Sequence, residues 1–170
     1  MPPLLAVLVL SLAACGGDGD DGAVPQPTTA GPSPSKVEFI RKADAVCREI
    51  LVDAEKIDQQ AAAIGASDLT NQNTQQVAAK IWQQQIALTR KFKNRLESLG
   101  APAGSENEVS QLVATLEEAI ALGDHIRTQL AGGQIADTPT FVEEYANVVQ
   151  QGNLQAQQFG FKVCGSPPQS

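Results

Sequence analysis

The chain of 170 residues has few of the residues on which metal and cofactor sites depend. It contains one histidine, one tryptophan, one tyrosine and three cysteines, and aromatic residues make up only 4% of it. A zinc or di-iron centre in a helical protein needs several histidine and carboxylate ligands that converge. His125 cannot supply such a set alone, and a Glu-x-x-His motif is absent because position 122 is leucine. We therefore expect no metal and no cofactor.

The motifs of common enzyme classes are also missing. The sequence has no Gly-x-Ser-x-Gly elbow, no Walker loop and no glycine fingerprint for dinucleotides. Two adjacent pairs, Glu117-Glu118 and Glu143-Glu144, lie in segments of helical periodicity. Neighbouring residues on a helix point about 100° apart, so at most one glutamate of each pair can face inward. We expect no catalytic residues and a protein that is not an enzyme.

Positive charge is scarce as well. Lysine and arginine total 12 against 19 aspartates and glutamates, which gives a net charge of −7. Such a balance disfavours binding to nucleic acid and to anionic lipid headgroups. Four basic residues between Arg90 and Arg95 stand near the end of a helical segment, where they complement the helix dipole. An anion-binding patch is the alternative interpretation of this cluster.

Residues 2–14 are apolar but too few to cross a bilayer, which takes about 20 residues. They end in Leu12-Ala13-Ala14-Cys15, which resembles the lipidation motif of bacterial lipoproteins. The resemblance implies a signal peptide over residues 1–14, cleavage before Cys15 and a diacylglycerol on that cysteine. The alternative is an ordinary secretory leader in which Cys15 is incidental. No lysine or arginine precedes the apolar run, so the true start lies upstream or the leader is atypical.

Residues 15–35 are rich in glycine, proline, threonine and aspartate, which predicts a disordered linker. Residues 36–165 are enough for a single domain, and we expect a disordered tail over residues 166–170. Asp18, Asp20 and Asp21 do not form a calcium loop, because the glycine and glutamate that such a loop needs at its sixth and twelfth positions are absent.

Four segments of residues 36–165 have apolar residues at helical spacing. We expect helices that begin after Ser35, near Asn73 or Thr74, after Ser105 and at Thr138. The first and third carry capping boxes, and Pro139 suits the first position of the fourth. The predicted stops are Gly65, Gly100, Gly132-Gly133 and Gly160. Short polar loops between amphipathic helices predict an antiparallel four-helix bundle.

Cys47 and Cys164 remain when Cys15 is set aside. An even remainder in an exported protein favours a disulfide. Cys47 lies on the inward face of the first predicted helix and Cys164 just past the fourth, and these helices are neighbours in an up-down bundle. Two buried thiols that never meet are the alternative. A redox pair is disfavoured because there is no Cys-x-x-Cys motif.

The residues around these cysteines resemble a family of small uncharacterised secreted lipoproteins of bacteria. The similar stretches are Ala43-Asp44-Ala45-Val46-Cys47 and Gly160-Phe161-Lys162-Val163-Cys164-Gly165. The resemblance implies a helical, disulfide-linked domain, and it implies no known activity.

These observations lead to two expectations for function. The first is a non-catalytic, lipid-anchored binding or interaction module on the extracytoplasmic face of a bacterial cell membrane, with an envelope protein as a possible partner. The second is a carrier or sensor of a small apolar ligand held between the helices. Alanine-rich helix faces are compatible with both, because they either allow close packing or leave room for a ligand. A carrier predicts an apolar cavity with one or two polar groups.

Overall fold

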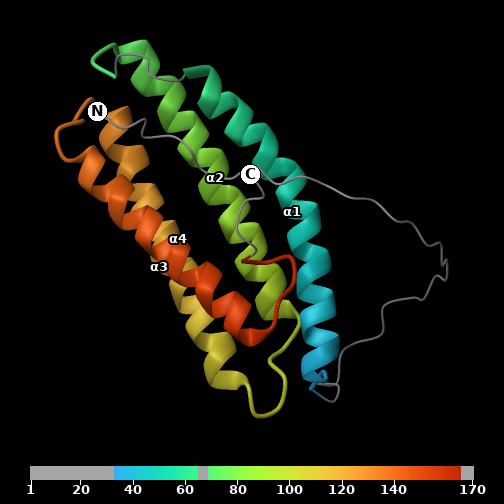
Figure 1. The fold of residues 1–170 in the computed structure, drawn as a ribbon. Coiled ribbons are helices and arrows are strands. Elements are labelled where there is room, and N and C mark those ends of the chain that lie inside the picture. Colours follow the sequence, from blue (N-terminus) through green and yellow to red (C-terminus); the bar gives the residue numbers. More distant parts are fainter. Residues whose placement is uncertain (1–32, 65–68, 166–170) are drawn as a thin grey trace, which may run out of the picture.

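A computed structural model of the chain describes residues 33–64 and 69–165. They form four helices: α1 (Lys36–Ile64), α2 (Gln72–Ser98), α3 (Glu106–Ala131) and α4 (Thr138–Phe159), which run alternately up and down (Figure 1). The predicted all-α, four-helix fold is confirmed. The predicted signal peptide, Cys15, nearly all of the linker, Gly65 and the tail over residues 166–170 lie outside the described residues. None of the described helices has the length and apolar character that a membrane crossing requires.

Two of the helices begin with side-chain caps. The hydroxyl oxygen of Ser35 accepts a hydrogen bond from the backbone N–H of Glu38 at 3.2 Å, as the predicted capping box requires. The second helix begins earlier than predicted. Asn71 is its N-cap, and the side-chain oxygen accepts from the backbone N–H of Asn73 at 2.8 Å.

The expected caps of the other two helices were wrong. Ser105 occupies the N-cap position of α3, but its side chain makes no capping hydrogen bond there. Its backbone is outside the extended region that directs an N-cap side chain toward the helix end. Asp137, not Thr138, is the N-cap of α4. The Thr138 hydroxyl donates backwards to the carbonyl oxygen of Gln134 at 3.5 Å, so it does not cap the helix.

The glycines beyond α2, α3 and α4 end these helices as predicted. Gly160 matters most for the site described below. Its φ of 111° is in the left-handed region, where glycine is free of Cβ strain. The N–H groups of Gly160 and Phe161 both donate to the carbonyl oxygen of Ala156, and this turn sends the chain back across the molecule.

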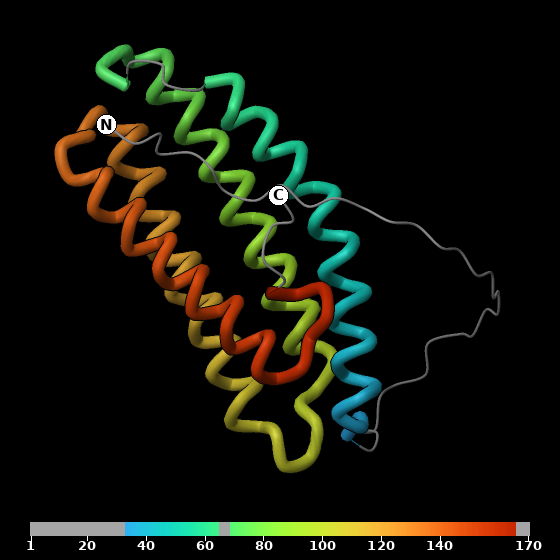
Figure 2. Tube along the Cα trace, viewed as in Figure 1, coloured from blue at the N-terminus to red at the C-terminus, as the bar shows by residue number. Residues whose placement is uncertain are grey.

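Along their lengths the helices pack against their neighbours in sequence: α1 on α2, α2 on α3, and α3 on α4. The backbones of α1 and α4 do not come close, so our expectation that these two helices pack side by side was wrong; they meet through side chains at one end, where Phe39 lies against Phe159. The two helices stand apart on the two sides of α2, and the chain after α4 crosses from one to the other (Figure 2). The bundle is therefore open along one side.

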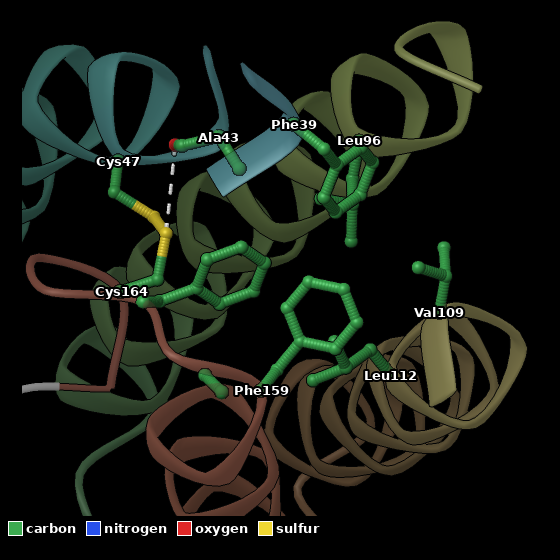
Figure 3. Packing of buried hydrophobic residues seen from close by; sticks show 10 residues of the cluster. Phe39, Ala43, Cys47, Leu96, Val109, Leu112, Phe159 and Cys164 are labelled. Carbon is green, nitrogen blue, oxygen red and sulfur yellow. Dashed lines mark hydrogen bonds between the residues drawn. A yellow bond between two sulfur atoms is a disulfide. The ribbon is translucent and has the colours of Figure 1, made fainter. Parts of the chain in front are cut away.

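Buried side chains form two clusters. The first, which we call the stapled end, combines residues of all four helices with the segment after α4. Its buried members are Phe39, Ala43, Cys47, Leu96, Val109, Leu112, Ala156, Phe159, Phe161 and Cys164 (Figure 3). The second, the open end, has buried members from α2, α3 and α4 alone. They are Ala79, Ala119, Ile126, Leu130, Tyr145 and Val148.

Burial along α1 follows the same division. Five residues between Phe39 and Cys47 are buried, whereas Ile57 is the one buried residue in the rest of the helix. Val77 departs from the apolar period of α2, since its side chain is 47% exposed. Trp82 is half-buried at the core boundary.

Candidate functional site

The open side of the bundle forms an apolar groove with a volume of about 210 Å³. The helices α1 and α4 form its walls, and α2 and α3 form its floor. Its apolar lining consists of Ile50, Leu51, Ala54, Leu88, Phe92, Leu96, Leu112, Leu116, Ala119, Val148, Val149, Ala156, Phe161 and Val163. Several of these side chains, including Leu51, Ala54 and Leu116, are half-buried, so the groove is accessible from solvent. An enclosed engineered cavity of about 150 Å³ is large enough to bind benzene.

The segment Phe161–Gly165 closes one end of this groove. Cys164 forms a disulfide with Cys47 of α1, and their Cα atoms are 5.6 Å apart, within the normal range. The predicted disulfide is confirmed, but it joins α1 to this segment, not to α4 itself. The dashed line in Figure 3 joins Cys164 Sγ to the carbonyl oxygen of Ala43 at 3.5 Å. A disulfide sulfur has no proton to donate, so we interpret this approach as a packing contact.

A buried carboxylate holds the same segment in place. Asp44 is only 4% exposed, and it accepts hydrogen bonds from three successive backbone N–H groups. The donors are Lys162, at 3.0 and 3.2 Å to the two oxygens, Val163 at 2.9 Å and Cys164 at 3.2 Å. Consecutive N–H groups that converge on one anion are a favourable site for a carboxylate. Asp44 thus fixes the end of the groove independently of the disulfide.

Aromatic packing completes the stapled end. The ring of Phe39, which is fully buried, contacts Phe159 edge-on with centroids 5.6 Å apart. Phe161 packs against both rings, at 6.1 Å from Phe39 and 5.1 Å from Phe159. Gly165 packs tightly at the end of this segment, because a Cβ there would lie 2.5 Å from the backbone oxygen of Asn153 in α4. The groove therefore ends against a rigid, covalently joined wall.

The opposite part of the groove carries hydrogen-bonding groups. The amide nitrogen of Gln85 donates to the hydroxyl oxygen of Tyr145 at 3.4 Å, and the Thr89 hydroxyl donates to the backbone oxygen of Gln85 at 3.0 Å. Burial raises the pKa of the Tyr145 phenol, so it stays protonated at neutral pH. Trp82 packs edge-on against Tyr145 with ring centroids 4.9 Å apart.

Asp58 lies beside this polar part. It stands one helical turn beyond Ala54, on the face of α1 that also carries Cys47 and Leu51. Its Oδ2 atom is buried and has no hydrogen-bond partner among the described residues. Desolvation, and secondarily the charge of Glu55, raise the pKa of Asp58 to about 6. The half-buried carboxylate is therefore ionised at neutral pH, while its Oδ2 atom has no donor among the described residues.

The other residues considered from sequence do not gather at one place. Glu117 pairs with Lys93 at 2.9 Å, while Glu118, Glu143 and Glu144 are exposed. The exposed His125 packs against the ring of Phe141, with centroids 4.0 Å apart. In the part of the chain that the structure describes, no group of histidine, cysteine and carboxylate side chains is arranged to hold a metal.

The four clustered basic residues late in α2 each pair with an acid. The partners lie on α1 for two of them, with Lys91 3.4 Å from Asp53 and Arg95 3.3 Å from Glu49. Arg90 pairs with Asp124 of α3, and Lys93 bridges Glu97 and Glu117. These acids neutralise the cluster, which removes the basis for an anion-binding patch.

Sequence reasoning missed both aspartates of α1. Asp44 was visible within the family-like stretch before Cys47, and a charged residue at an inward-facing position was the available signal. Asp58 follows the same apolar period, since it stands four residues after Ala54. Neither position reveals in the sequence alone whether the carboxylate finds a partner.

Comparison with known proteins adds no further constraint. No family model matches this chain, and no curated protein or solved structure shows significant similarity to it.

Proposed function

We propose that this protein is a lipid-anchored binding protein of the bacterial cell envelope that carries or senses a small apolar ligand in the groove between α1 and α4. The observation that supports this most is the groove itself, an accessible, mainly apolar cavity of about 210 Å³ with a few polar groups in its lining. Ligand sites in proteins commonly combine these features.

The exposed apolar side chains favour this ligand-binding role over docking of a protein partner on a helix face. The most exposed large ones among the described residues are scattered over different elements. They are Val37, Val52, Leu69, Val77 and Leu154. A protein interface is usually marked by a contiguous apolar patch, and the apolar surface here is concentrated inside the groove.

The same lining supports a non-catalytic role. None of the described residues that line the groove is charged, and its two cysteines are joined in the disulfide, so neither is a free thiol nucleophile. The membrane anchor of the proposal rests on the Leu12-Ala13-Ala14-Cys15 motif. An acyl anchor on Cys15 would place the domain on the extracytoplasmic face.

The first test is native mass spectrometry of the oxidised full-length protein, released from membranes of the cells that produce it. We expect a discrete small molecule in addition to the lipid on Cys15. A second test titrates the protein with octan-1-ol, followed by calorimetry and by the emission of Trp82, the chain's one tryptophan. Saturable binding supports the proposal.

A variant pair makes this test specific to the groove. Ala54→Phe places a large ring in the groove and should weaken octan-1-ol binding at least about ten-fold, because the ring occupies the ligand's volume. Ala63→Phe makes the same change at an exposed position of α1 and should leave binding unchanged. Absence of saturable binding to the wild type, or equal binding by both variants, would overturn the proposal.

A further inference from the structure

The charges around the groove indicate which kind of polar group its ligand carries. This inference rests on the proposed function. No lysine, arginine or histidine lines the groove. The basic residues nearest on α2, Lys91 and Arg95, are paired with Asp53 and Glu49 outside it. A ligand with a carboxylate or phosphate head would therefore lose its hydration in the groove and gain no cation in return.

The charge that does lie beside the groove is negative. Asp58 continues the groove-facing side of α1 one turn beyond Ala54, and its buried Oδ2 lacks a donor among the described residues. Its charge is close enough to Tyr145 to add to the effect of burial in raising the pKa of that phenol. Asp58 of α1 does not itself line the groove but lies near the part of it that Gln85 of α2 and Tyr145 of α4 line.

A buried hydrogen-bond acceptor without a donor favours a ligand that brings a donor. An unpaired buried charge destabilises the fold, and a donor that carries positive charge offsets that cost most strongly. The rest of the groove, from Ala54 to the Phe161–Gly165 segment, is mainly apolar, with Thr115 and Asn153 as its polar side chains. A molecule with an amine at one end and a hydrocarbon body would match both parts at once.

We propose that the natural ligand is an apolar molecule with a protonated amine, whose amine pairs with Asp58 while its hydrocarbon body extends along the groove toward the Cys47–Cys164 disulfide. Tyr145 and Gln85 flank the amine and offer it oxygen acceptors. The groove selects against the corresponding anionic amphiphile.

Three ligands that share one hydrocarbon chain test this inference directly: octylamine, octan-1-ol and octanoate. Each is titrated into the oxidised full-length protein at pH 7.5, below its micelle-forming concentration, with calorimetry and Trp82 emission as readouts. A charge-assisted hydrogen bond predicts about ten-fold tighter binding of the amine than of the alcohol. Octanoate should bind more weakly than the alcohol.

Two matched variants locate the source of this preference. Asp58→Asn should reduce the ratio of amine to alcohol affinity to about one. Asp53→Asn removes the same charge from α1, but at a residue paired with Lys56 and Lys91 away from the groove. It should keep the ratio of the wild type.

The outcomes separate this inference from the proposed function. Saturable binding of the alcohol with no preference for the amine would overturn the inference and leave the groove as a ligand site. The inference would also fail if Asp58→Asn kept the preference, or if Asp53→Asn lost it. If none of the three ligands bound, the proposed function itself would fail.

Discussion

The two ends of this bundle differ in how α1 packs against the other helices. At the stapled end, α1 shares a core with the other helices and with the segment after α4, and the disulfide and Asp44 secure it. At the open end, the buried cluster belongs to α2, α3 and α4, and α1 contributes no residue to it. The difference shows that one continuous helix can belong to the core at one end and form a wall of a groove farther along.

Asp44 and Asp58 of α1 differ in the same way as the two ends of the bundle. Asp44 is buried at the stapled end and accepts from three backbone N–H groups, so its charge is compensated. Asp58 lies toward the open end, where its buried Oδ2 atom has no donor among the residues that the structure describes. A carboxylate that finds donors within the fold contributes to stability, whereas one that does not is available to a ligand. Local conflicts of this kind are often found at functional sites.

The largest expected effect on stability comes from removing the Cys47–Cys164 disulfide. Replacing both cysteines, Cys47→Ala with Cys164→Ala, opens a loop in which the bridged residues are 117 positions apart. Chain-entropy arguments predict a loss of about 4 kcal/mol in the free energy of unfolding. Urea unfolding followed by circular dichroism measures this, and the reduced wild type should behave like the variant. A change below about 1 kcal/mol would mean that packing alone holds the stapled end.

A smaller effect is expected from Asp44→Ala, which leaves the N–H groups of Lys162, Val163 and Cys164 without their acceptor. We expect a loss of about 2–3 kcal/mol in unfolding free energy, because these groups lie at a largely buried junction. Asp53→Ala, on the same helix, serves as the control and should have a much smaller effect, because its ion pairs with Lys56 and Lys91 are solvent-accessible. Equal effects of the two changes would contradict the role assigned to Asp44.

The smallest expected effect on the free energy of unfolding comes from Asp58→Asn, which should stabilise the protein to an extent that depends on pH. Because the pKa of Asp58 rises from 3.8 to about 6 on folding, the folded state holds this proton more tightly than the unfolded state. The contribution of Asp58 to the free energy of unfolding is therefore most favourable below pH 3.8, where the group is protonated, and this contribution is lost as the pH rises toward 6. Asp58→Asn should therefore stabilise the protein at pH 7 by about 1 kcal/mol, allowing for solvent screening of a partly exposed group.

Denaturant unfolding of the Asp58→Asn variant at several pH values checks this. The difference from the wild type should disappear near pH 3.5, where Asp58 is protonated in both states. A variant that is less stable than the wild type at pH 7 would show that Asp58 has a partner in the folded protein and would remove the contrast with Asp44.

Much of the fold could be predicted from the sequence because it depends on local patterns. Apolar residues at steps of three and four defined the helices, and glycines after α2, α3 and α4 defined their ends. The caps were harder to predict. Ser105 has the right residue type and spacing for a capping box, but its backbone conformation does not direct the hydroxyl at the helix end. That conformation depends on the loop around Pro102, which has no short sequence signature.

The candidate site was less predictable than the fold. Alanine-rich faces left both a filled core and a cavity open as interpretations. The choice depended on whether α1 and α4 pack along their whole lengths, which is a property of helices far apart in sequence. Nor does the sequence show that the Asp44 carboxylate meets the backbone of Lys162, Val163 and Cys164, because this contact forms only after the chain turns at Gly160.

By itself, the sequence determined the four helices and, once Cys15 is set aside, favoured a disulfide between Cys47 and Cys164 over two free thiols. These features follow from local periodicity and from composition. The tertiary structure decided that α1 and α4 separate beyond the stapled end, that the segment after Gly160 joins them, and that Asp44 has donors while Asp58 Oδ2 has none among the described residues. The physical reason is that helix packing and hydrogen-bond satisfaction depend on which surfaces meet, and residues distant in the chain set those surfaces jointly.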